Sequence, residues 1–125
     1  MPSRLRPADP EAVEAALARV ASGTTGRADL RLLTKHFLAL LEERAPGRSV
    51  EVRVPPYAAV QVIEGVRHTR GTPPAVIETD AETWVALATG ELAWADALES
   101  GAAQASGERT DLSPYLPLTA AGQGG

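Results

Sequence analysis

The chain has 125 residues, enough for one domain with its own core, and it contains no cysteine. The lack of thiols excludes disulfides, thiolate zinc sites and a cysteine nucleophile. The net charge of −4 argues against a general nucleic-acid binder, which needs a basic surface. Aromatic residues make up only 4% of the chain, so Val, Leu and Ala should form most of the core, with Trp84 and Trp94 as the bulky exceptions.

The first residues lack the apolar segment of a secretory signal. No apolar run approaches the roughly 20 residues that span a bilayer. A basic amphipathic helix, which would hold a protein at a membrane surface, is also missing from the pattern. We therefore expect a cytoplasmic protein without stable membrane anchoring.

Two helices are predicted in the N-terminal part, residues 9–45. Asp9 can cap the first, Pro10 suits its first position, and Gly23 ends it. The second runs over 27–44 and ends before Pro46-Gly47, with an apolar face that should pack on a sheet. Leucines also fall outside that face, so this helix is expected to be covered on more than one side.

Strands are predicted in the second part, residues 50–118. Residues 50–54 alternate valine with charged residues, which is typical of a half-buried strand. Residues 58–65 alternate little and should form a more central strand, covered on both faces. A basic loop over 67–74 leads to a third strand at 75–79. The alanines of 102–106 give a weaker fourth one.

Short helices should complete this part. Thr79 and Glu82 fit a capping box for a helix that ends at Gly90, and Asp80 is an alternative cap. A second short helix is expected over 92–100. A last one should end near Leu116, capped by Asp111 or Ser113. We expect 119–125 to be a disordered tail.

No catalytic, metal or cofactor site emerges from the motifs. Glu78 and Asp80 are close enough in sequence to serve as acid and base, but helix capping explains Asp80 by itself. His36 and His68 lack partners at metal-ligand spacing. There is no G-x-S-x-G elbow and no glycine-rich phosphate loop. His68 lies between Arg67 and Arg70, a cluster that suits an anionic head group or is a solvated loop.

The two short helices share an apolar set that is either filled core or the wall of a cavity. Short helices joined by glycines can part to admit an apolar chain, and small residues leave volume beside them. Together with one strand residue, the candidate wall consists of Val62, Trp84, Leu87, Ala88, Leu92, Trp94 and Leu98.

From about Val50 onward the chain resembles the sterol carrier protein type two superfamily, especially its short actinobacterial orthologues. The order of strands and helices and several local segments carry the resemblance. These segments are 50–57, 67–74, Glu78-Thr79-Asp80 with Trp84, the T-W-x-x-L-A-x-G run at 83–90, and 106–109.

The resemblance implies an α+β fold in which helices cover one face of a single, mostly antiparallel sheet of about five strands. The pattern alone indicates four strands. One domain over 1–118 is then expected. Family members bind fatty acids, acyl-CoA, phospholipids or sterols between sheet and helices, usually without catalysis. The long apolar C-terminal segment that shapes the tunnel in animal members is absent from this sequence.

Three hypotheses follow. The first is a non-catalytic lipid-binding protein that holds an acyl or polycyclic ligand against the candidate wall, with Arg67 and Arg70 as head-group contacts. The second is an accessory module with a filled core that docks to a protein partner. The third is an isomerase-related enzyme, since the fold is also appended to thiol-dependent isomerases.

Overall fold

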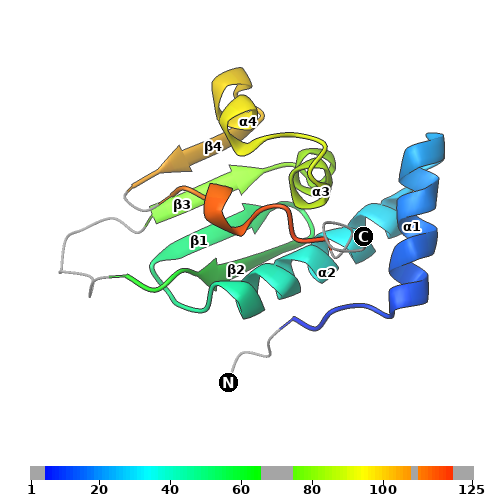
Figure 1. Ribbon diagram of the computed structural model, residues 1–125, viewed down its shortest axis with the longest axis horizontal. Coiled ribbons are helices and arrows are strands. Elements are labelled where there is room, and N and C mark those ends of the chain that lie inside the picture. The colour runs from blue at the N-terminus through cyan, green and yellow to red at the C-terminus, as the bar shows by residue number, and fades with distance from the viewer. Residues whose placement is uncertain (1–4, 66–74, 108–109, 120–125) are drawn as a thin grey trace.

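The computed structural model describes residues 5–65, 75–107 and 110–119, which form four α-helices, a four-stranded sheet and a short 3-10 helix (Figure 1). In chain order the elements are α1 (Pro10–Ser22), α2 (Arg27–Arg44), β1 (Val50–Val54), β2 (Ala58–Val62), β3 (Ala75–Thr79), α3 (Ala81–Thr89), α4 (Trp94–Ser100), β4 (Ala103–Ser106) and η1 (Ser113–Tyr115). The predicted α+β class and the order of the elements are confirmed. The expected tail lies outside the described residues from 120 onward.

The sheet has the strand order β2-β1-β3-β4. β1 pairs antiparallel with β2 and parallel with β3, and β3 pairs antiparallel with β4. The expected strand count of about five is therefore too high for the described residues, and one pairing is parallel. The prediction that β2 is central and covered on both faces is wrong, because β2 is an edge strand whose Ala59 and Gln61 are exposed.

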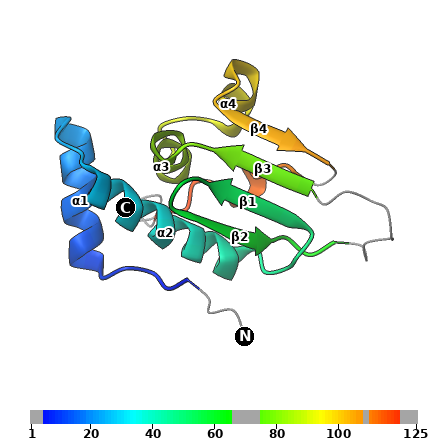
Figure 2. The same cartoon turned by 180° about the vertical axis from the view of Figure 1, so that it is seen from behind.

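One face of the sheet is buried and the other is open. Val50, Val52 and Val54 of β1 are fully buried, whereas Glu51 and Arg53 between them form an ion pair on the open face. The C-terminal segment lies behind β1 and β3 when the open face is viewed (Figure 2). Because buried and exposed residues alternate along β1, the sequence pattern predicts this strand clearly.

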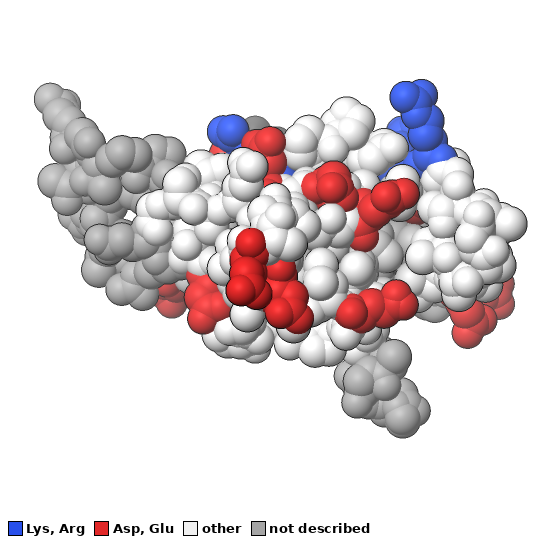
Figure 3. All heavy atoms as spheres, turned by 90° about the horizontal axis from the view of Figure 1, so that it is seen from above, with Lys and Arg blue, Asp and Glu red and all other residues white. Residues whose placement is uncertain are grey.

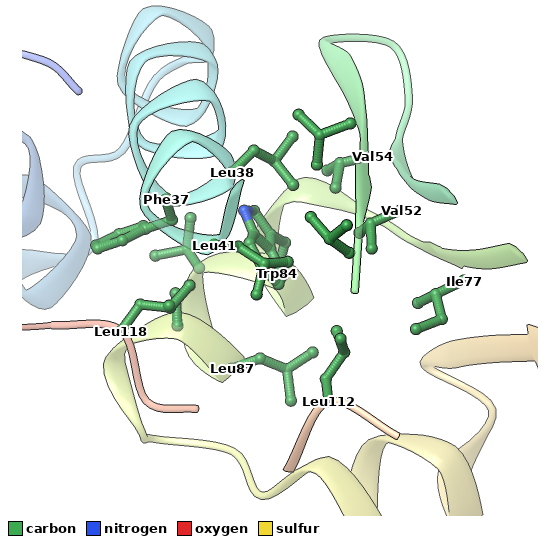
Figure 4. Close-up of a cluster of buried hydrophobic side chains, with 14 of the residues drawn as sticks. Phe37, Leu38, Leu41, Val52, Val54, Ile77, Trp84, Leu87, Leu112 and Leu118 are labelled. Atoms are coloured by element: carbon green, nitrogen blue, oxygen red, sulfur yellow. The ribbon is translucent and has the colours of Figure 1, made fainter. Parts of the chain in front are cut away.

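The core fills the space between the buried face, α2, α3 and the C-terminal segment (Figure 4). α2 contributes Leu33, Phe37, Leu38 and Leu41, each at most 1% exposed. Leu112 and Leu118 from the C-terminal segment enter the same cluster. The C-terminal segment therefore lies on the same side of the sheet as the helices.

The predicted strand over 58–65 is shorter in the structure, because the chain leaves the sheet at Ile63. Its φ of 68° lies in the left-handed region, which a β-branched residue rarely adopts. Three hydrogen bonds hold it there. Ile63 N donates to Ala45 O at 2.7 Å, and Ile63 O accepts from Ser49 N at 3.0 Å and Ser49 Oγ at 2.6 Å. β2 ends at Val62 because Ile63 pairs with the loop before β1 instead.

α1 lies at one end of the molecule, away from the sheet and against α2 (Figures 1 and 2). Arg19 near the end of α1 clamps Asp29 in the first turn of α2 with Nε at 3.0 and 2.9 Å from the two carboxylate oxygens and Nη2 at 2.7 Å from Oδ1. This guanidinium lowers the pKa of the Asp29 carboxyl. A bidentate arginine pair has a specific geometry, so this ion pair restricts the angle between α1 and α2.

The helix starts fall at or near the predicted residues, but the side chain of Asp9, the predicted cap of α1, makes no capping hydrogen bond. Asp80 accepts a hydrogen bond from Thr83 N at 2.7 Å. The cap of α3 is therefore Asp80, the alternative considered from the sequence, and not Thr79. Thr79 instead donates its hydroxyl to Ala102 O at 2.9 Å, beside β4. Asp111 accepts from Ser113 N at 3.0 Å at the start of η1.

Candidate functional site

The candidate wall is packed core in this structure. Val62, Trp84, Leu87 and Ala88 are fully buried, and Trp94 is 6% exposed. Leu92 is half-buried against the same cluster, whereas Leu98 points outward with 40% of its surface exposed. The structure thus brings most of the predicted set together, but it presents them as interlocked side chains (Figure 4).

Trp84 lies at the centre of that packing. Its indole nitrogen donates to the backbone oxygen of Thr34 on α2 at 3.3 Å. This bond gives the buried indole its polar partner and ties α3 to α2.

Of the other candidate site residues singled out in the sequence, His36 lines the groove described below. Arg67, His68 and Arg70 lie outside the described residues. Glu78 and Asp80 are exposed, on the open sheet face and at the cap of α3. No group of three potential metal ligands occurs within residues 5–65, 75–107 and 110–119.

An apolar groove of about 650 Å³ opens between α1, α2 and the C-terminal segment. α1 lines it with Pro10, Val13, Glu14 and Leu17, α2 with His36, Phe37, Leu40, Glu43 and Arg44, and the C-terminal segment with Leu118 and Thr119. Its floor is aliphatic and aromatic, and charged side chains stand at its rim. Ligand pockets commonly have this size and this distribution of polar groups.

The C-terminal wall of the groove is fixed by hydrogen bonds. Arg44 Nη1 donates to Tyr115 O at 3.0 Å and to Pro117 O at 2.8 Å. Leu118 N donates to Ala88 O at 2.8 Å. These bonds hold Leu118, which is 2% exposed, against the groove floor.

The polar group with the most altered environment in the groove is His36. Its Nδ1 accepts a hydrogen bond from Ala8 N at 3.0 Å, so it fastens the N-terminal arm. Burial lowers the pKa of His36, while the charge of Glu43 acts in the opposite direction. The folded state therefore favours the neutral imidazole, whose Nδ1 lone pair is free to accept.

This environment predicts an acid-sensitive contribution to stability. As the pH falls below about 6.5, the unfolded chain binds a proton at His36 before the folded chain does. The stabilisation is complete above that pH and is lost as the pH falls toward the lower folded-state pKa. The urea midpoint of the wild type should therefore fall more between about pH 7.5 and pH 5.5 than that of His36→Gln. Equal declines in the two proteins would contradict this role of His36.

Sequence reasoning missed this groove. The leucines outside the main apolar face of α2, which predicted that this helix is covered on more than one side, are Leu32 and Leu38, and neither lines the groove. Leu40 belongs to the face that was expected to pack on the sheet, but it is half-buried and lines the groove beside α1. The partner surfaces, however, come from residues distant in the chain.

A model of the bacterial sterol carrier protein ortholog family matches residues 26–118. The chain belongs to this family. The resemblance predicted from about Val50 onward is thereby confirmed, and the match extends beyond it to α2. α1 precedes the matched residues, so one wall of the groove comes from outside the family match. A search of curated proteins found no match.

Within the described residues, no helix of this sterol carrier protein homologue is both long and apolar enough to cross a membrane. The family is generally one of non-catalytic carriers of apolar molecules. In the part of the chain that the structure describes, the groove beside α1 is an apolar hollow open to the outside, whereas the side chains between sheet and helices are buried in a packed cluster.

Proposed function

We propose that this protein is a non-catalytic cytoplasmic carrier that binds one acyl or polycyclic apolar ligand in the groove beside α1. The observation that supports it most directly is an open hollow of about 650 Å³ with an apolar floor, in a member of a sterol carrier family. Burial of apolar ligand surface against that floor would drive binding at about 25 cal/mol per Å².

The groove has features suited to reversible uptake. Leu17 and Leu40 are half-buried, so apolar surface is already exposed to an entering ligand. One side of the groove is α1, which lies apart from the sheet and is anchored at its end by the pair of Arg19 and Asp29. A ligand can therefore enter without opening the packed core around Trp84.

The sequence-based wall remains a second proposed location for the ligand. Entry there requires α3 and α4 to part from the sheet, which would change the surroundings of Trp84 and Trp94. Neither tryptophan lines the groove. Intrinsic tryptophan emission therefore distinguishes the two locations, since it should change strongly only for a ligand between sheet and helices.

Leu40→Asp tests the groove. A charged side chain on the floor should weaken binding of a long-chain acyl ligand by about tenfold or more, because apolar contact is lost and a carboxylate is desolvated. Leu32→Asp is the matched control, since Leu32 is also a half-buried leucine of α2 but does not line the groove. Titrations followed by native mass spectrometry give both affinities. Equal affinities in the two variants would exclude the groove as the site.

An accessory interaction module is the second candidate function, and the filled core favours it. Residues 75–107 also contain no Lys or Arg, and they expose Glu78, Asp80, Glu82, Glu91, Asp96 and Glu99. Figure 3 shows carboxylates spread over one face, with cationic side chains near its margins. A partner with a basic surface would match it. Absence of ligand uptake, together with a partner lost on Asp96→Lys, would favour this alternative.

A further inference from the structure

A second hollow lies where the first turns of α2 meet the turn between β1 and β2. It measures about 570 Å³ and is lined by Arg27, Ala28, Arg31, Pro56 and Tyr57. Both arginines are exposed, and neither forms an ion pair with a carboxylate in the described part of the chain. Two guanidinium groups thus face one hollow without an anionic partner.

The positions of these arginines oppose helix stability. Arg27 is the first residue of α2, and Arg31 follows one turn later on the same side. Like charges at this spacing repel each other. Cations also interact unfavourably with the positive N-terminal end of a helix dipole. Positions that break local rules without a compensating contact are expected where a ligand is bound.

The surroundings supply a defined place for an anion. Tyr57 is half-buried and packs against the core, so the position of its ring is restricted. The turn that carries it is closed by a hydrogen bond from Tyr57 N to Val54 O at 2.9 Å. Two planar guanidinium groups and a phenolic hydroxyl match the several acceptor oxygens of a phosphate group.

We propose that Arg27, Arg31 and Tyr57 form a binding site for a phosphate group, borne by a soluble phosphorylated compound or by a lipid head group. The site is independent of the apolar groove. Arg27 and His36 differ by nine positions, as do Arg31 and Leu40, and at about 100° per residue such pairs point to opposite sides of α2. Failure of either site therefore leaves the other intact.

The test is a titration of the ¹⁵N-labelled protein with inorganic phosphate, at constant ionic strength maintained with chloride. Saturable shifts should be confined to the amides around Arg27, Arg31 and Tyr57. The double variant Arg27→Gln/Arg31→Gln should lose affinity by about tenfold or more, because charge-assisted hydrogen bonds are removed. Its Tm should be unchanged or higher, since repulsion within α2 is relieved.

Arg6→Gln/Arg48→Gln is the matched control, because it removes the same charge from exposed arginines that do not line the hollow. It should bind phosphate like the wild type. Sedimentation with phosphatidate-containing vesicles that is lost in Arg27→Gln/Arg31→Gln assigns the phosphate to a lipid, and binding of free phosphate alone assigns it to a soluble ligand. The proposal is overturned if the wild type shows no saturable shift, if the double variant keeps its affinity, or if the control loses as much.

Discussion

Trp84→Ala should lower the free energy of unfolding by about 3–5 kcal/mol, the range found when large aromatic residues are truncated in a filled core. The side chain is fully buried, and its loss leaves a cavity between α2, α3 and the sheet. The hydrogen bond from its indole to Thr34 O is lost as well. Urea unfolding of the wild type and the variant gives the difference.

Trp84→Phe removes the indole donor but only part of the packed ring. It keeps an aromatic ring and loses the indole donor, so its cost should be smaller, about 1–2 kcal/mol. Leu98→Ala, at a side chain that is 40% exposed, should change stability by no more than about 0.5 kcal/mol. A stable Trp84→Ala variant would mean that the layer around this residue is not packed, and would favour a ligand cavity there.

Gly47→Ala should be the most disruptive substitution in a loop, with a loss of about 3 kcal/mol. A Cβ at this position would lie 2.2 Å from the backbone C and O of Ile63 and 2.3 Å from Glu64 N. Backbone atoms cannot rotate away as a side-chain end can. The loop must therefore move, which would break the hydrogen bonds of Ile63 to Ala45 and Ser49.

Gly23→Ala measures the cost of a side chain at a positive φ without a close contact, whereas Gly47, with a φ of 152°, combines a backbone cost with the close approach. Gly23 ends α1 with a φ of 79°, and a Cβ there would meet nothing within 4 Å. This variant should lose about 1 kcal/mol from the left-handed backbone alone. Thermal unfolding of both variants measures the difference. If they lose the same amount, the close approach at Gly47 contributes nothing.

The sequence predicted most helices and strands correctly because each depends on residues close together in the chain. The alternation of β1, Pro10 at the start of α1, and the glycines that end α1, α3 and α4 each act within a few residues. The predicted length of β2 was wrong because its end depends on contacts with a segment distant in the sequence. Val62 and Ile63 read as one apolar run, but Ile63 turns to the loop that contains Gly47 and Ser49, which a strand pattern cannot reveal.

The candidate site was harder to predict for the same reason. An apolar stripe such as that of α3 looks the same whether it faces packed side chains or a cavity, and here it faces packed side chains. The groove requires α1, α2 and the segment around Leu118 to meet, and hydrogen bonds from Arg44 to Tyr115 and Pro117 hold that segment in place. No periodicity in one segment carries that information.

The most direct test of the proposed function is native mass spectrometry of the protein purified from its own host, followed by organic extraction and a repeat with Leu40→Asp. We expect one extra mass per chain that extracts as an apolar molecule and is reduced in the variant, without a large change in tryptophan emission when the ligand is restored. A protein that remains free of ligand, also after incubation with fatty acids, acyl-CoA and sterols, would contradict the proposal.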